Sequence, residues 1–281
     1  MRLSPATRNL LRLGVGITLA FIYIPLLVIA IYAFNDGTTL RWPLDGLTTK
    51  WFSDALQDSG ARDAFSTSIK VGVAATAIAL VLGTLASFAV ARHRFFGRET
   101  ISFLVVIPIA LPGIVTGVAL SDTFTQIFGI SLSLFTVVVG HATFCIVVVY
   151  NNVIARLRRV SGNLEEASAD LGAHTWQTFR HVTLPNMQTA LVAGGLLAFA
   201  LSFDEIIVTT FTIGAGDETL PIWIYSNLFR GQQLPITNVV AVIVVLLSII
   251  PVYLAHRLTR EEGVSARAGG AGAIAESTAM P

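Results

Sequence analysis

Charged residues are scarce in this chain of 281 residues. Asp, Glu, Lys and Arg together make up 12% of it, whereas soluble domains carry about 25%. Hydrophobic residues reach 54%, and the mean hydropathy is +0.73. This composition excludes disordered, collagen-like and disulfide-scaffold proteins, and it indicates that lipid surrounds most of the chain.

Cysteine is nearly missing, and phosphate-binding motifs are missing altogether. The single cysteine, Cys145, excludes an intrachain disulfide, and the sequence has no Cys/His cluster of the kind that structural zinc requires. A formal net charge of +1 excludes the broad basic surface of a nucleic-acid-binding protein. No GxxxxGK(S/T) phosphate loop occurs, so we expect that this chain does not hydrolyse nucleotide by itself. We predict no catalytic residue, metal site or cofactor.

The strict alternation of apolar and polar residues that is typical of membrane β-barrel strands is also missing, and continuous apolar runs are present instead. Each run is long enough to cross a bilayer, which takes about 20 residues per helix. The runs cover residues 13–34, 68–91, 101–121, 132–153, 187–211 and 237–256. We therefore expect an all-α membrane protein with six transmembrane helices and with both termini on the same side.

The basic residues indicate which side that is, because Lys and Arg accumulate on cytoplasmic loops. With the N-terminus inside, thirteen of the 18 basic residues fall on inner segments: Arg2, Arg8, Arg12, Arg92, Arg94, Arg98, Arg156, Arg158, Arg159, Arg180, Arg257, Arg260 and Arg267. Both termini are therefore predicted to be cytoplasmic, in a multi-pass protein of the inner or plasma membrane. The predicted organisation is an N-terminal segment 1–12, a six-span domain 13–258 with an outer loop 35–67, and a disordered tail 259–281.

One inner segment, 161–185, has a helix-turn-helix pattern in the sequence SGNLEEASADLGAHTWQTFRHVTLP. Asn163 is placed to cap a first helix that ends at Gly172, and Thr175 is placed to cap a second piece that ends at Pro185. The apolar face consists of Leu164, Ala167, Leu171, Trp176, Phe179 and Val182. Such an amphipathic pair rests on lipid headgroups, covers its own bundle, or docks to another protein.

The spacing within this segment resembles the EAA loop of ABC import permeases, in which EAA is followed by three residues, Gly, nine residues and I-x-LP. The matching residues are Glu166, Ala167, Ser168, Gly172, Val182, Leu184 and Pro185, with Ser for Ala and Val for Ile as the departures. The resemblance implies a type I ABC importer bundle whose coupling helix inserts into a groove of a separate ATPase subunit. Glu166 is our candidate for the polar contact, and its alternative role is to stabilise the helix N-terminus.

Two adjacent carboxylates, Asp204 and Glu205, interrupt the fifth apolar run in its outer third. Ionisable side chains at membrane depth are costly, so they are a functional hypothesis by default. We interpret them as passage residues that attract a cation from outside, with Asp122 at the outer end of the third run as a weaker candidate. Alternatively, Lys70 pairs with one acid, or one acid hydrogen-bonds to an interrupted helix.

The sequence around these acids narrows the resemblance. It is similar to the second permease subunit of spermidine/putrescine-type importers over most of residues 65–258, in the stretches LPGIVTGVALSD, GHATFCIVVVYNNVIARLRR, ALSFDEIIVTTF, TLPIWIY and TNVVAVIVVLLSIIPVYL. The resemblance implies that the chain forms half of a polyamine passage. It also implies a second permease subunit, ATP-binding cassette ATPase subunits and an extracytoplasmic solute-binding protein as partners. Importers of other organic cations and small solutes share much of this sequence.

A rival from another class is an ion-coupled secondary transporter, which also explains intramembrane acids. Such transporters usually contain inverted repeats, and we find none in this sequence.

Other polar groups and prolines inside the apolar runs each have two interpretations. His141, with Cys145 one turn later, is a proton relay or metal ligand, or it ties helices together through hydrogen bonds. One His and one Cys do not make a metal site, which favours the tie. Pro108 and Pro112 interrupt the third run and form either a hinge or a static bend.

Overall fold

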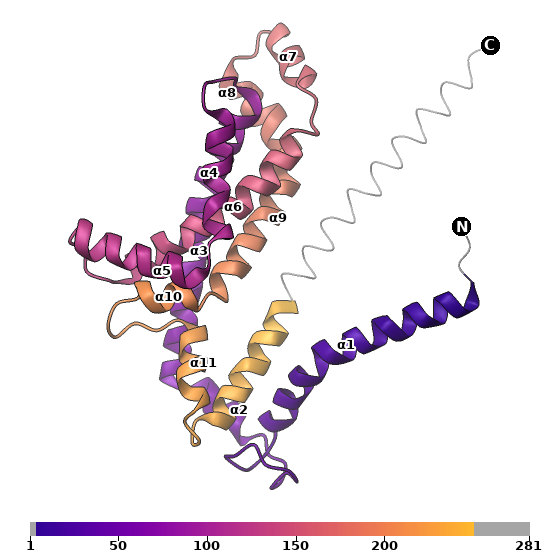
Figure 1. Cartoon of the computed structure of the whole chain (residues 1–281), viewed down its shortest axis with the longest axis vertical. Helices are drawn as coiled ribbons and strands as arrows, with labels where there is room; N and C mark the ends of the chain where they lie inside the picture. Colours follow the sequence, from indigo (N-terminus) through magenta and orange to yellow (C-terminus); the bar gives the residue numbers. More distant parts are fainter. Residues whose placement is uncertain (1–3, 250–281) are drawn as a thin grey trace. The chain divides into compact units, whose positions relative to one another are not determined.

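The computed structural model describes residues 4–249, and within them helices are the only regular elements apart from one isolated antiparallel bridge between Asn35 and Leu47 (Figure 1). The helices are α1 Pro5–Ala33, α2 Lys50–Gln57, α3 Ser59–Arg92, α4 Arg98–Ala110, α5 Gly113–Asp122, α6 Leu134–Leu157, α7 Asn163–Asp170, α8 Thr175–Thr178, α9 Leu184–Phe203, α10 Ile207–Thr212 and α11 Leu220–Leu228. Two π-helical turns, η1 Thr123–Ile127 and η2 Phe179–Thr183, and an apolar helix Leu234–Ile249 are also present. The predicted all-α fold is confirmed for this part of the chain.

The described residues form two compact units. The first contains residues 4–63 and 223–249, and the second contains residues 64–222. Every candidate coupling and passage residue predicted from the sequence lies in the second unit.

Four helical stretches are long and apolar enough to cross a membrane, namely α1, α3, α6 and the stretch Thr175–Phe203 that ends with α9. A fifth crossing arises if α4 and the α5–η1 helix count as one span, although the two are bent by 104°. The apolar helix Leu234–Ile249 is shorter. The end of the predicted run 237–256 and the predicted tail 259–281 lie outside the described residues.

The bend between α4 and α5 lies within the run 101–121, which the sequence predicts to be interrupted at Pro108 and Pro112. Leu111 is extended, with φ −80° and ψ 143°, and Pro112 directly precedes the first turn of α5. Proline disfavours helical backbone at the preceding residue, so Pro112 moves Leu111 out of the helix. Pro108 stays inside α4. The break is therefore made by Pro112 alone.

In the first unit, most side chains of α1 are apolar, and most of them are exposed. Ser4 caps the helix by accepting a hydrogen bond from the Thr7 backbone N–H at 3.1 Å, and Pro5 occupies the first helical position, where a missing N–H costs nothing. None of the most apolar window of α1 is buried. A helix that is apolar on all sides needs lipid or another subunit around it.

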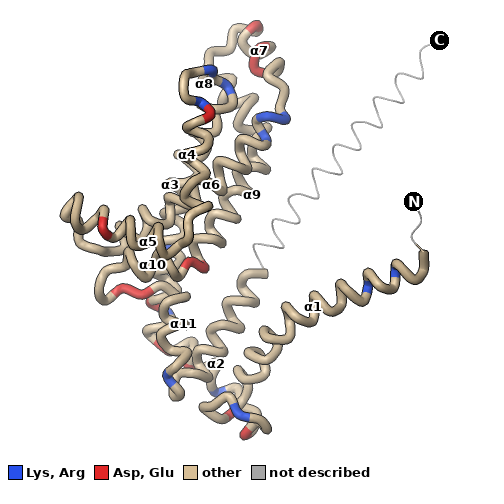
Figure 2. The backbone as a smooth tube through the Cα atoms, in the orientation of Figure 1, with Lys and Arg blue, Asp and Glu red and all other residues tan. Residues whose placement is uncertain are grey.

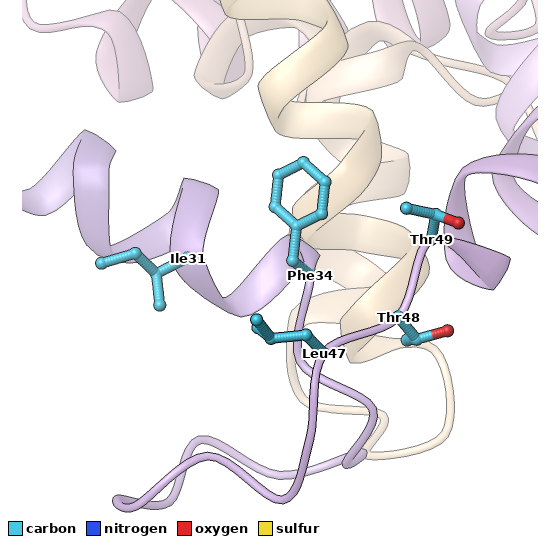
Figure 3. A pocket seen from close by; sticks show the side chains of 5 residues that line it. All are labelled: Ile31, Phe34, Leu47, Thr48 and Thr49. Atoms are coloured by element: carbon cyan, nitrogen blue, oxygen red, sulfur yellow. The ribbon is translucent and has the colours of Figure 1, made fainter.

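In the first unit, the segment between α1 and α3 contains the short helix α2. The Trp51 indole N–H donates to the Asn35 carbonyl at 2.8 Å, which ties α2 to the end of α1. An open hollow of about 620 Å³ lies beside this junction, and its lining residues are Ile31, Phe34, Leu47, Thr48 and Thr49 (Figure 3).

The second unit is built on α3, α6 and α9. On α6 and α9, the Cys145 thiol donates to the Ala198 carbonyl at 3.3 Å, and the Arg156 Nε donates to the Asn186 carbonyl at 2.9 Å. Positions later on α6 thus meet positions earlier on α9, so the two helices are antiparallel (Figure 1). Gly83 lets α3 approach α6 closely, because a Cβ there would lie only 3.0 Å from Val149.

Apolar side chains of α6 supply most of the core of the second unit. The buried cluster consists of Ala79, Phe144, Cys145, Val149, Val153, Leu157, Met187, Ala198 and Val208. Figure 1 shows α7 and α8 at one end of the α6–α9 pair and α5 and α10 at the other. These two ends contain the two groups of candidate site residues.

Candidate functional site

The segment 161–185 folds as two helices joined at Gly172, as predicted. Gly172 has φ +84°, a left-handed conformation that glycine adopts without strain, and its N–H donates to the Ala169 carbonyl at 2.9 Å. The predicted caps are each wrong by one residue. Gly162 precedes α7 in place of Asn163, and His174 precedes α8, where its N–H donates to Gln177 Oε1.

Pro185 does not end the second helix, contrary to the sequence prediction. It lies in the first turn of α9, and the helical stretch continues from Thr175 to Phe203. The π-helical turn Phe179–Thr183 comes directly before α9. A proline inside an α-helix removes one backbone hydrogen bond and crowds the preceding turn, and the wider turn at this place accommodates both effects.

Glu165, in the first turn of α7, connects three elements of the second unit. Its carboxylate lies 3.1 Å from Arg92 Nε at the end of α3. The Thr183 hydroxyl, in η2, donates to Glu165 Oε1 at 3.2 Å. Both charged side chains are largely buried, with exposed fractions of 21% and 24%. Sequence reasoning missed this ion pair because its partners lie far apart along the chain.

Glu166 differs from its neighbour because it is exposed, as is Ala167. Large apolar side chains share this surface, since Leu171 is 89% exposed and Trp176 is 62% exposed. The Trp176 ring stacks on Phe179 at 5.5 Å between centroids. Figure 2 shows acidic and basic residues around α7 and α8. The segment thus exposes a carboxylate and an apolar surface, and the Arg92–Glu165 ion pair fixes it to α3.

At the other end of the second unit, the predicted run 187–211 is interrupted. The helix α9 ends at Phe203, and α10 begins at Ile207. Asp204 and Glu205 therefore lie in a break between two helices within the predicted fifth run.

Asp204 is exposed at the C-terminal end of α9. Among the residues that the structure describes, neither Lys70 nor any other side chain forms an ion pair with it. The carbonyl groups at a helix C-terminus carry partial negative charge, which adds to that of the carboxylate. This place consequently favours a cation.

Glu205 has a local structural partner. Its Oε1 accepts a hydrogen bond from the Val208 backbone N–H at 2.8 Å, in the first turn of α10. The first N–H groups of a helix have no partner within the helix, so this carboxylate satisfies one of them. This hydrogen bond is the one expected from the alternative stated for the sequence, in which one of the two acids bonds to an interrupted helix.

His141 connects the two sides of the same break. Its side chain is 0% exposed. Nδ1 lies 2.7 Å from the Ser202 hydroxyl in α9, and Nε2 lies 2.8 Å from the Thr209 hydroxyl in α10. The predicted helix tie is present, and within the described residues no group of three or more His, Cys, Asp or Glu side chains gathers to hold a metal.

Asp122, the weaker candidate, is the exposed last residue of α5. The helix α5 packs on α10, where a Cβ on Gly117 would lie 2.8 Å from Phe211. Two further acids, Asp217 and Glu218, follow α10 and were not selected from the sequence. They fall outside the long apolar runs, so no membrane argument pointed to them. Figure 2 shows acidic positions near α5 and α10.

A family model described as a binding-protein-dependent transport system inner membrane component matches residues 79–261, a range that includes both groups of candidate residues. The chain belongs to this family. It is thus a membrane transport component with several apolar helices, which agrees with the predicted class of protein.

Named relatives agree with this assignment. The chain is 31% identical over 231 residues to the putrescine transport system permease protein PotI of Escherichia coli strain K12, over 80% of this chain and 81% of PotI. It is 31% identical over 243 residues to the spermidine/putrescine transport system permease protein PotC of Haemophilus influenzae, over 86% of this chain and 93% of PotC. The predicted resemblance to polyamine-type ABC permeases is therefore confirmed.

A solved structure shows the same fold. It is a bacterial alginate ABC transporter in complex with an alginate pentasaccharide-bound periplasmic protein. Its matched chain superposes with a TM-score of 0.70 at 13% identity, over 91% of this chain and 94% of that chain. The fold of this chain is therefore that of an ABC transporter subunit.

Proposed function

We propose that this chain is one transmembrane subunit of an ATP-driven importer and forms half of the passage for a polyamine such as putrescine or spermidine. The observation that carries the proposal is the exposed surface of α7 and of the turn after it, where Glu166 and Gly172 keep the EAA spacing. The polyamine class is supported by the names of PotI and PotC. It is also supported by the exposed Asp204 at a helix C-terminus. The positive ammonium groups of a polyamine complement both the carboxylate and the partial negative charge of the helix end.

The proposed arrangement is a six-span domain over 13–258 in the type I importer fold, with cytoplasmic residues 1–12 and 259–281 at its two ends. A second permease subunit completes the passage, because six helices from one chain form only half of it. ATP-binding cassette subunits dock at the coupling loop 161–185, and an extracytoplasmic solute-binding protein delivers the substrate. The exposed apolar surface of α1 supports a partner in the membrane.

In the proposed coupling step, α7 inserts into a groove of the ATPase subunit. Glu166 makes the polar contact, and the exposed apolar side chains fill the groove. Ala167 and Gly172 keep the helix and its turn compact, while Leu184 and Pro185 join the segment to α9. Closure of the ATPase then moves the segment and reorients the bundle, whereas this chain hydrolyses no ATP itself.

In the proposed passage, Asp204 attracts an ammonium group at the break between α9 and α10. Asp122 and Glu205 add negative charge in the same unit, and Glu205 has the further role of a cap. Residues that combine charge with an exposed helix end are a common way to bind ions inside transporters.

The test is energy-dependent uptake of labelled putrescine and spermidine by cells that lack this chain. We expect uptake to return with the wild-type chain and to disappear when the ATPase subunits are deleted. If the wild-type chain instead restores uptake of a different cation or small solute, the proposed substrate class is wrong and the assignment as an ABC permease still holds. Uptake that persists without any ATPase would instead indicate an ion-coupled secondary transporter.

A further inference from the structure

We infer that His141 is a positioning residue that holds open the break between α9 and α10 and thereby fixes where Asp204 faces. This inference rests on the proposed function, because Asp204 is its proposed substrate contact. His141 itself touches no substrate and acts through the shape of the break.

The break needs such a residue because the sequence alone does not make it. The stretch from Phe203 to Ile207 reads FDEII and contains neither proline nor glycine. Interruptions of membrane helices usually occur at one of these two residues. Beyond the cap that Glu205 provides for α10, we therefore expect a contact from elsewhere in the fold to favour the interrupted form over a continuous helix.

His141 supplies that contact from the middle of α6. It bonds Ser202, in the last turn of α9, and Thr209, in the first turn of α10. The Thr209 hydroxyl also donates to the Glu205 carbonyl at 2.8 Å, so the chain of bonds reaches into the break itself. All three side chains, those of His141, Ser202 and Thr209, are buried. A buried polar group in a membrane protein is costly without partners, so the three groups hold one another in place.

The direction of the bonds follows from Thr209. Because its hydroxyl hydrogen goes to the Glu205 carbonyl, Thr209 accepts from His141, and Nε2 carries the ring proton. The other nitrogen, Nδ1, then accepts from the Ser202 hydroxyl. A neutral imidazole completes the network, and a side chain with only one polar atom cannot replace it.

The experiment measures the distance across the break in the full-length chain, purified with the subunits that bind it and placed in nanodiscs. Spin labels are attached at Leu197 on α9 and Thr210 on α10, both exposed, after Cys145→Ala removes the one native cysteine. We expect a narrow distance distribution in the wild type. We expect His141→Leu and Thr209→Val to broaden it and shift it toward a continuous helix, in which about 13 residues span about 20 Å between Cα atoms.

The same variants are assayed for uptake. We expect the KM for putrescine to rise about three- to tenfold with a smaller change in Vmax, as for the loss of one or two membrane hydrogen bonds. Thr209→Ser keeps the hydroxyl and should behave as wild type. Thr143→Val is the matched control, because within residues 4–249 the Thr143 hydroxyl bonds to the Gly140 carbonyl of its own helix, at 2.6 Å, and to no other helix.

Each outcome bears on the inference. An unchanged distance distribution in both His141→Leu and Thr209→Val overturns it, and so does a shifted distribution with an unchanged KM. Thr209→Val keeps the branched shape of the side chain and removes only the hydroxyl, so it remains informative where His141→Leu does not fold. A wild-type chain that carries no polyamine would refute the proposed substrate, while the distance measurement would still decide the role of His141.

Discussion

Asp204 and Glu205 are adjacent in sequence and have different environments. Asp204 is exposed at the end of α9, whereas Glu205 accepts a hydrogen bond from the first turn of α10. From the sequence, both were candidate passage residues, with the alternative that one of them hydrogen-bonds to an interrupted helix. Their separation into a candidate contact and a cap is the main correction at the scale of single residues.

We predict that Asp204→Asn raises the KM for a dication about tenfold while assembly with the ATPase stays unchanged, because one attractive charge at a helix C-terminus is lost. The control is Glu205→Gln, in which the amide oxygen still accepts from Val208. That variant loses a charge but keeps the cap, so it should reduce uptake less than Asp204→Asn does. Glu205→Ala should cost about 1 kcal/mol of stability, as does the loss of a helix cap. Equal uptake by wild type and Asp204→Asn would return Asp204 to a structural role.

The ion pair between Arg92 and Glu165 gives a second prediction for single residues. We expect Glu165→Arg and Arg92→Glu each to lower the uptake obtained per ATP hydrolysed, because α7 is then no longer tied to α3. The double exchange should restore most of this ratio, since it reverses the pair and keeps its attraction. Asp170→Asn, on the same helix, is the matched control. The prediction is contradicted if the double exchange is no better than the single variants.

At the scale of elements, the turn at Gly172 sets the direction in which α8 leaves α7. Proline cannot adopt φ +84° and also removes the N–H that donates to Ala169. We predict that Gly172→Pro uncouples ATP hydrolysis from uptake while membrane insertion stays normal. Gly162→Ala is the control, because Gly162 has φ −62° and open space at its Cβ position. Measuring both rates in the same vesicles tests the prediction, and wild-type coupling in Gly172→Pro would refute it.

Two elements differ from the sequence expectation for physical reasons of different kinds. The bend between α4 and α5 has a local cause, since Pro112 forces Leu111 out of the helix. Sequence reasoning found both prolines in this run and could not decide which of them breaks it. The break between α9 and α10 contains no proline or glycine, so the sequence offered an interrupted helix there only as an alternative role for one acid.

At the scale of the whole molecule, the orientation in the membrane is still a prediction from the basic residues. After Cys145→Ala, single cysteines can be introduced at Ser4, Thr39 and Gly162. We expect a membrane-impermeant maleimide added outside intact cells to label Thr39→Cys and to spare the other two. Permeabilised cells should label all three. Labelling of Ser4→Cys from outside would reverse the proposed orientation.

Composition and local spacing are enough to predict the membrane character, the helical class, the positions of the apolar runs and the EAA-spaced segment. These features depend on composition and on spacing within short stretches, because lipid selects apolar residues wherever the chain crosses it. Three-dimensional contacts were needed to find that His141 bridges α9 and α10, that Glu165 pairs with Arg92, and that Glu205 is a cap. The first two of these contacts join residues more than 60 positions apart, so no local pattern encodes them.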